Sequence, residues 1–153
     1  MSELMVCVFE GEDRAVHISG TLVRDLAGAV EDAAFVSRNA DGGVHTELAT
    51  NLVEKGKYGG IFWGMMIALI FWARWWEMSI GGAVGELGLD DDFVKEAGNA
   101  LKKRCSALLL VVTSTGADAA AEVCAQAGAE VLRSEFGPHD EERLAAVFGT
   151  RLE

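Results

Sequence analysis

The chain has 153 residues, of which 50% are apolar, and 13 Lys and Arg residues against 24 Asp and Glu residues give it a formal charge of −11. This length predicts one folded domain, and this composition excludes a chain that is disordered throughout. The acidic balance excludes the basic surface that a nucleic-acid-binding protein needs. The mean hydropathy is nevertheless positive, at +0.21, which indicates that one segment carries a concentrated apolar load.

The first third of the chain predicts an alternation of strands and a helix. Short apolar runs indicate the strands, apolar residues at helical spacing indicate the helix, and the Asp-Gly and Gly-Gly pairs before Val44 indicate a tight turn. The predicted elements are a strand over 4–9, a helix over 18–30, a strand over 33–37 and an edge strand over 44–48.

The last third repeats this pattern. Residues 107–113 are the clearest buried strand in the chain, and Gly128 stands where a glycine usually ends a helix. The predicted elements are a helix over 93–101, a strand over 107–113, a helix over 117–127, a strand over 130–134 and a final helix that begins at Gly137-Pro138. The helix over 117–127 is expected to present Ala120, Val123, Cys124 and Ala127 inward.

Two βαβ halves, residues 4–37 and 107–134, therefore flank a middle segment. Two such halves interleave naturally into an antiparallel sheet with helices on one face, the ferredoxin-like arrangement of an α+β protein. A doubly wound parallel sheet is the alternative, but the chain has too few strand–helix alternations for it. The expected organisation is a first half over 1–57, an inserted hydrophobic helical hairpin over 58–88 and a second half over 89–153.

The apolar load lies in residues 58–85, which hold all four tryptophans and only two charged residues, Arg74 and Glu77. As a helix, the uncharged part over 58–73 would span about 24 Å, which is less than the roughly 30 Å of a hydrocarbon core. Three interpretations stay open: a hairpin that enters a bilayer with its tryptophans at the interface, an interface between subunits, or a buried helix of an ordinary core.

Small residues recur four apart in this segment, as Gly60-x-x-x-Gly64-x-x-x-Ala68 and Gly81-x-x-x-Gly85. Such a spacing, a glycine zipper, lets helix backbones approach closely. Each glycine costs a helix about 1 kcal/mol relative to alanine, so close packing has to offset that cost. The candidate interface or membrane residues are Gly60, Trp63, Gly64, Ala68, Trp72, Arg74, Trp75, Trp76, Gly81 and Gly85.

Several stretches together resemble a bacterial family of unknown function, the DUF1269 family, whose members are often described as predicted membrane proteins. The resembling stretches are Glu12-Asp13-Arg14-Ala15, Glu31-Asp32-Ala33-Ala34-Phe35-Val36-Ser37-Arg38, Asp41-Gly42, Gly59-Gly60-Ile61-Phe62-Trp63-Gly64, Asp90-Asp91-Asp92-Phe93-Val94-Lys95-Glu96 and Ser106-Ala107-Leu108-Leu109-Leu110. The resemblance implies a glycine-rich apolar hairpin in a small α+β domain and no assigned activity. The sequence departs from the family pattern at residues 71–77, which are aromatic and charged instead of rich in Gly and Ala, and at residues 102–105, where the family usually carries Pro-Gly.

The sequence contains no recognisable catalytic constellation. His17, His45 and His139 lie far apart in polar surroundings, and Asp90-Asp91-Asp92 is explained as the N-terminal cap of the helix that follows it. The three cysteines form no C-x-x-C pair and are interpreted as small buried hydrophobes. We therefore expect a non-enzymatic protein without a metal or cofactor.

The leading hypothesis is a cytoplasmic protein that self-associates, or attaches to the inner membrane, through residues 58–88. A homo-oligomer, inner-membrane lipid and a larger protein complex are the expected partners, and nucleic acid is not. One alternative is a regulatory ferredoxin-like protein that binds a lipid or another small ligand, with the tryptophans lining its pocket. Another alternative is an accessory subunit that docks on a larger complex.

Overall fold

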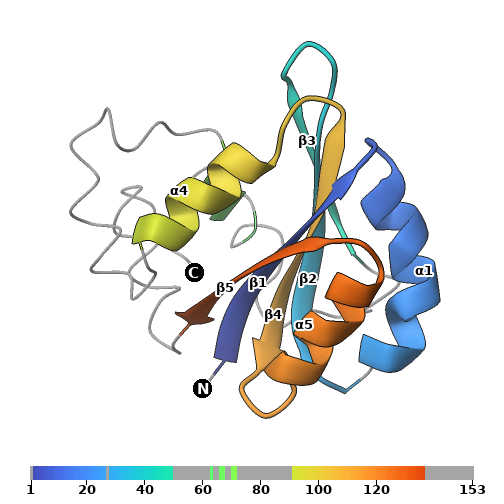
Figure 1. Ribbon diagram of the computed structural model, residues 1–153, viewed down its shortest axis with the longest axis vertical. Helices are drawn as coiled ribbons and strands as arrows, with labels where there is room; N and C mark the ends of the chain where they lie inside the picture. Colours follow the sequence, from blue (N-terminus) through green and yellow to red (C-terminus); the bar gives the residue numbers. More distant parts are fainter. Residues whose placement is uncertain are drawn as a thin grey trace, which may run out of the picture.

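The computed structural model of the protein describes residues 2–26, 28–49, 63, 66, 67, 70, 71 and 91–136. Within these residues the chain is an α+β protein whose strands form one antiparallel sheet (Figure 1). In chain order the elements are β1 (Ser2–Glu10), α1 (Arg14–Leu26), β2 (Val30–Arg38), β3 (Val44–Leu48), α4 (Asp91–Ala100), β4 (Cys105–Thr113), α5 (Ala117–Gln126) and β5 (Glu130–Phe136).

The strand order across the sheet is β3-β2-β4-β1-β5. Strand β4 lies between β2 and β1 and is antiparallel to both, so the two strands joined by α1 are parallel and separated by one strand. In the same way, β1 lies between β4 and β5, the strands joined by α5. The two halves of the chain therefore interleave in one sheet, and the prediction of an α+β antiparallel sheet is confirmed. Strand β3 lies at one edge, as its sequence predicted.

Helices cover both faces of the sheet. Leu4, Val6 and Val8 of β1 point to the face covered by α4, and the residues between them point to the face covered by α1 and α5 (Figure 1). The helices of the two βαβ halves, α1 and α5, thus share one face as expected, and α4, which lies outside those halves, covers the other. The reason is visible in the central strand β4, where every side chain over 107–112 is buried, so neither face can be left to water.

Two glycines end helices through a left-handed backbone. Gly128 has φ +97°, and the amides of Gly128 and Ala129 donate to the carbonyls of Ala125 and Cys124, which is a Schellman motif. This confirms the predicted end of α5. Gly28 has φ +87°, and α1 has already ended at Leu26. The prediction that this helix continues through Val30 is therefore wrong, because the chain turns at Gly28 and Val30 begins β2.

The turn between β2 and β3 has the predicted form. The side-chain Oδ1 of Asn39 accepts hydrogen bonds from the amides of Asp41 and Gly43, at 3.0 and 2.8 Å. Gly42 takes φ +91° there, a conformation that glycine adopts without steric cost. The helix predicted after Gly137-Pro138, and most of the hairpin predicted over 58–88, lie outside the described residues.

Candidate functional site

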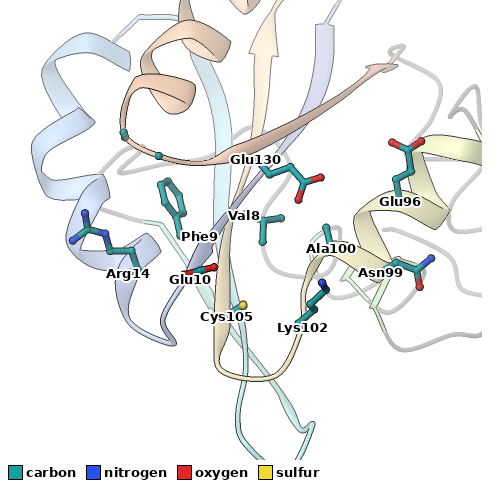
Figure 2. Close-up of a pocket in the computed structure, with 12 residues that line it drawn as sticks. Val8, Phe9, Glu10, Arg14, Glu96, Asn99, Ala100, Lys102, Cys105 and Glu130 are labelled. Carbon is teal, nitrogen blue, oxygen red and sulfur yellow. The ribbon is translucent and has the colours of Figure 1, made fainter.

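An open hollow of about 860 Å³ lies at the end of the sheet where β1 finishes (Figure 2). It lies in a notch of the sheet. Strand β5 begins at Glu130, opposite Val8, whereas β1 continues through Phe9 and Glu10, which still pair with β4. Beside these two residues no described strand occupies the β5 side, and the hollow opens there.

Four apolar residues line the inner part of the hollow. Val8 belongs to the core on the α4 face and Phe9 to the core on the opposite face, and both are almost fully buried. Ala100 at the end of α4 and Ala127 directly after α5 are half-buried. The volume of the hollow lies within the range of about 300–1,000 Å³ that is usual for ligand sites.

Charged side chains form the rim of the hollow. Arg14 and Glu96 stand on opposite sides of it, with Glu130 between them (Figure 2). The full set is two cations and three carboxylates: Arg14, Lys102, Glu10, Glu96 and Glu130. Among the described residues, none of these five side chains forms an ion pair or a side-chain hydrogen bond. Charges of both signs therefore surround one space without neutralising each other.

One buried hydroxyl fixes the turn that carries Arg14 to the rim. The Ser106 Oγ on β4 donates to the carbonyl of Gly11 at 2.7 Å and accepts from the amide of Ala15 at 2.9 Å. The amide of Gly11 donates to the carbonyl of Arg104 at 2.9 Å. The start of α1 and the turn before β4 are thereby tied together, and Arg14 and Lys102 are carried by the same bonded framework.

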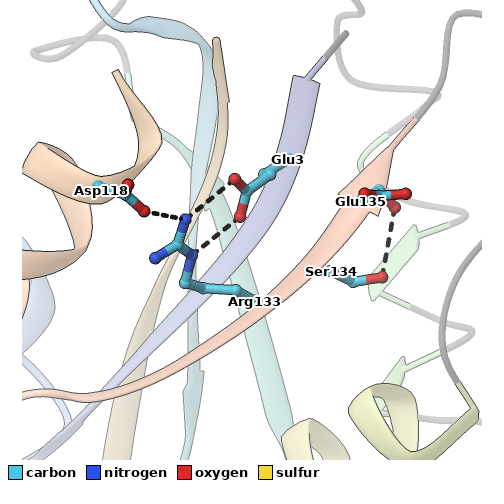
Figure 3. A network of polar contacts seen from close by, with 5 residues as sticks. All are labelled: Glu3, Asp118, Arg133, Ser134 and Glu135. Carbon is cyan, nitrogen blue, oxygen red and sulfur yellow. Dashed lines mark hydrogen bonds and ion pairs between the residues drawn. The ribbon is translucent and has the colours of Figure 1, made fainter. Parts of the chain in front are cut away.

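A separate polar network lies on the surface where β1, β5 and α5 meet (Figure 3). The Arg133 guanidinium donates to both carboxylate oxygens of Glu3, at 2.8 and 3.0 Å, and to Asp118 at 2.8 Å. The bonds to Glu3, and after them the bond to Asp118, raise the pKa of Arg133. The bonds to Glu3 link β5 to β1. Because Asp118 is exposed and Arg133 is about a third exposed, the network adds little to stability.

Five described residues of the apolar segment lie in the core of the domain. They are Trp63, Met66, Ile67, Ile70 and Phe71, all helical in conformation and between 0% and 7% exposed. They pack with α4 and with the α4 face of the sheet. Their spacing is that of a single helical face. The segment therefore contacts the domain through the face that these five residues form.

Two contacts fasten the end of this stretch. Gly98 of α4 lies so close to it that a Cβ atom at Gly98 would stand 2.6 Å from the carbonyl oxygen of Ile70. The Arg38 guanidinium donates to the carbonyls of Leu101 at 2.8 Å and Phe71 at 3.4 Å, and also to the β2–β3 turn. Helix α4, the sheet and the apolar segment therefore meet at Phe71, directly before the sequence Trp72-Ala73-Arg74.

A comparison with models of protein families shows to which family the chain belongs. The model of the family described as "Protein of unknown function (DUF1269)" matches residues 57–149, which is more than half of the chain. The chain belongs to the DUF1269 family. The comparisons with curated proteins and with solved structures give no match.

The DUF1269 match begins at residue 57, directly before the apolar segment, and runs past β5. It includes Glu96, Lys102 and Glu130 of the rim. The other two charged residues of the rim lie in the first part of the chain, which also holds the resembling stretches over 12–15, 31–38 and 41–42. The DUF1269 match and the residues before it thus contribute to the same hollow.

Of the interface residues predicted from the sequence, the structure describes Trp63, and it places this side chain in the core. The others lie outside the described residues: Gly60, Gly64, Ala68, Trp72, Arg74, Trp75, Trp76, Gly81 and Gly85. No described helix of this DUF1269 protein is long and apolar enough to cross a membrane. In the same part of the chain, no three His, Cys, Asp or Glu side chains are grouped as they would be to hold a metal ion.

The structure also brings together two cysteines that are distant in sequence. Cys7 of β1 and Cys124 of α5 are both fully buried, whereas Cys105 is half-buried, and all three are free thiols. The hydrogen bond with Cys124 and then burial raise the pKa of the Cys7 thiol well above its ordinary value. The prediction of buried cysteines is confirmed for Cys7 and Cys124. No local motif signalled their contact, or the hollow, because both depend on strand pairing.

Proposed function

We propose that this DUF1269 protein is non-enzymatic and that it self-associates through the apolar segment over residues 58–88. The observation that carries this proposal is the use of one helical face, Trp63 to Phe71, by the domain's own core. Residues 64, 65, 68 and 69, which separate the buried residues in the sequence, are Gly, Met, Ala and Leu. A helix that is apolar on all sides needs cover beyond that face, and a second copy of the same segment can supply it.

The anchoring of the segment favours a second copy over a bilayer. The side chains from Trp63 to Phe71 pack on the sheet, and Gly98 of α4 approaches the backbone of Ile70. That face cannot contact lipid while it fills the core. Beside it, the proposed interface is the row Gly60, Gly64 and Ala68, where small residues permit close approach of two backbones. In this proposal Trp72, Arg74, Trp75, Trp76, Gly81 and Gly85 extend the interface.

We also propose that the fold is the ferredoxin-like arrangement with an inserted hairpin. The interleaving of β1-α1-β2 with β4-α5-β5 supports it, as does the placement of α1 and α5 on the same face. In this view β3 extends the sheet by one edge strand, and α4 covers the face on which the segment packs.

The test is the mass of the full chain in solution without detergent, measured by light scattering after size-exclusion chromatography. We expect an oligomer, and we expect Gly60→Ile and Gly64→Ile to lower its mass because a branched side chain separates the backbones. Gly20→Ile is the matched control, since Gly20 is exposed on α1 and has no atom within 4 Å of an added Cβ. Circular dichroism and urea unfolding confirm that each variant is folded.

Three other results would each contradict self-association through the small-residue row. A monomeric chain that floats with vesicles of phosphatidylethanolamine and phosphatidylglycerol would replace self-association by attachment to the inner membrane. A monomer that does not float, but is isolated from its source in stoichiometric amounts with another protein, would replace it by docking on a larger complex. An oligomer whose mass is unchanged in both glycine variants would refute the small-residue row.

A further inference from the structure

The residues named above as lining the hollow beside β1 all belong to the described part of the chain, and none of them is in the apolar segment. The position of the hollow follows from strand register, because β5 begins opposite Val8 while β1 runs on to Glu10. The strands and helices around it are held by backbone pairing and by the Ser106 bonds to Gly11 and Ala15. The named lining residues are therefore held in place by the folded domain.

The charges on the rim restrict the chemistry of an occupant. An anion would meet the carboxylates of Glu10, Glu96 and Glu130, and a molecule with only positive charges would meet Arg14 and Lys102. A molecule with one group of each sign can place its carboxylate near a cation and its ammonium near a carboxylate. None of the five side chains has an ion-pair partner among the described residues, so binding would break no ion pair between those residues.

The apolar part of the lining restricts the rest of the molecule. Val8 and Phe9 are only 7% and 3% exposed, so the half-buried Ala100 and Ala127 provide accessible apolar surface in the hollow. This small surface favours a short aliphatic side chain over a second polar group. We propose that the hollow binds a small zwitterion of the amino-acid class, with its charged groups at the rim and its side chain beside Ala100 and Ala127. The site is open to water, so the pairs are screened, and we expect a dissociation constant of about 0.1–10 mM.

The experiment is a titration of the full chain, labelled with ¹⁵N, with each common amino acid at up to about 30 mM, which covers the expected affinity. We expect at least one amino acid to shift the amide signals of Phe9, Glu10 and Glu130 in a saturable manner. For that amino acid, the analogue without the amino group and the analogue without the carboxyl group should each bind about ten-fold more weakly or not at all. This comparison separates zwitterion recognition from simple burial of the side chain.

Variants test the rim. Lys102→Gln and Glu130→Gln should each weaken binding about five-fold or more, because each removes one charge while leaving the fold intact. Lys95→Gln and Glu122→Gln are the matched controls, since both residues are exposed on α4 and α5 and neither lines the hollow. The controls should bind as the original chain does.

Several results would overturn the inference. No saturable shift with any amino acid, equal binding of the singly charged analogues, or shifts confined to residues away from the hollow would each exclude it, as would unchanged affinity in both rim variants. The mass of the chain in solution is measured separately. Failure of self-association therefore leaves this inference standing, and the reverse also holds.

Discussion

Replacing Gly98 with alanine is expected to destabilise the protein, although alanine is the better helix former. Gly98 lies within α4, where alanine should stabilise by up to about 1 kcal/mol. An added Cβ atom would, however, stand 2.6 Å from the Ile70 carbonyl oxygen, inside the 3.0 Å limit that real Cβ contacts essentially never cross. The obstacle is backbone, which cannot rotate away as a side chain can. Helix α4 or the segment at Ile70 must therefore move.

Overpacking of this kind costs about 1–3 kcal/mol. After the gain in helix propensity is subtracted, we expect Gly98→Ala to lower the free energy of unfolding by up to about 2 kcal/mol. For a chain of this size that corresponds to a fall of up to about 8 °C in the midpoint of thermal unfolding. Urea unfolding followed by circular dichroism measures the same difference at constant temperature.

Gly20→Ala is the matched control. Gly20 is also a helical glycine, on α1, but an added Cβ there has nothing within 4 Å. The intrinsic gain should then appear undiminished, and the variant should be more stable by about 0.5–1 kcal/mol. If Gly98→Ala stabilised the protein as much as Gly20→Ala does, α4 would not approach the backbone of Ile70, and the described packing of the apolar segment would be refuted.

Three further predictions test other contacts of the fold. Met66→Ala should lower the free energy of unfolding, measured in urea, by about 2–5 kcal/mol because Met66 is fully buried. A loss below about 1 kcal/mol would contradict the burial of this side chain. Arg38→Ala should cost about 2 kcal/mol, and Arg38→Lys should recover little of it, because a single ammonium cannot donate to Leu101, Gly42 and Phe71 together. The Cys7 pKa is raised from 9.0 by its hydrogen bond with Cys124 and by burial, so the protonated thiol is favoured in the folded state. The stabilisation of the folded state that follows from this raised pKa is complete below about pH 9, and it is lost as the pH rises further. The free energy of unfolding should therefore fall less steeply between about pH 9 and pH 10.5 in Cys7→Ala than in the original chain, and equal slopes would contradict this role.

The strands and helix ends could be predicted because their signals are local. The unbroken apolar run over 107–112 requires burial on both sides of β4, and Gly128 supplies a left-handed residue directly after α5. The edge strand β3 directly follows the turn over residues 39–43, whose Asn and Gly residues signal that turn. In each case the cause lies within about ten residues of its effect.

The distribution of helices between the two faces could not be predicted in this way. The buried run in β4 states that both faces are covered but does not state by which helices. Helix α4 takes the second face because it packs with the apolar segment through Gly98 and Ile70, and this contact joins residues far apart in the chain. The hollow has a similar origin, since it exists only because β5 pairs with β1 in a register that leaves Phe9 and Glu10 beyond its start.

The apolar segment shows the same division most clearly. Residues 58–73 carry no charge, so the sequence predicts an apolar helix there but does not distinguish one side of that helix from another. In the folded chain, the protein's own sheet and α4 cover the side formed by Trp63, Met66, Ile67, Ile70 and Phe71. The hydrophobic effect has no direction and rewards burial against lipid, a second subunit or the same domain alike. Composition therefore predicts that the segment is buried, and only the pairing of distant strands and the packing of α4 select the side that the domain covers.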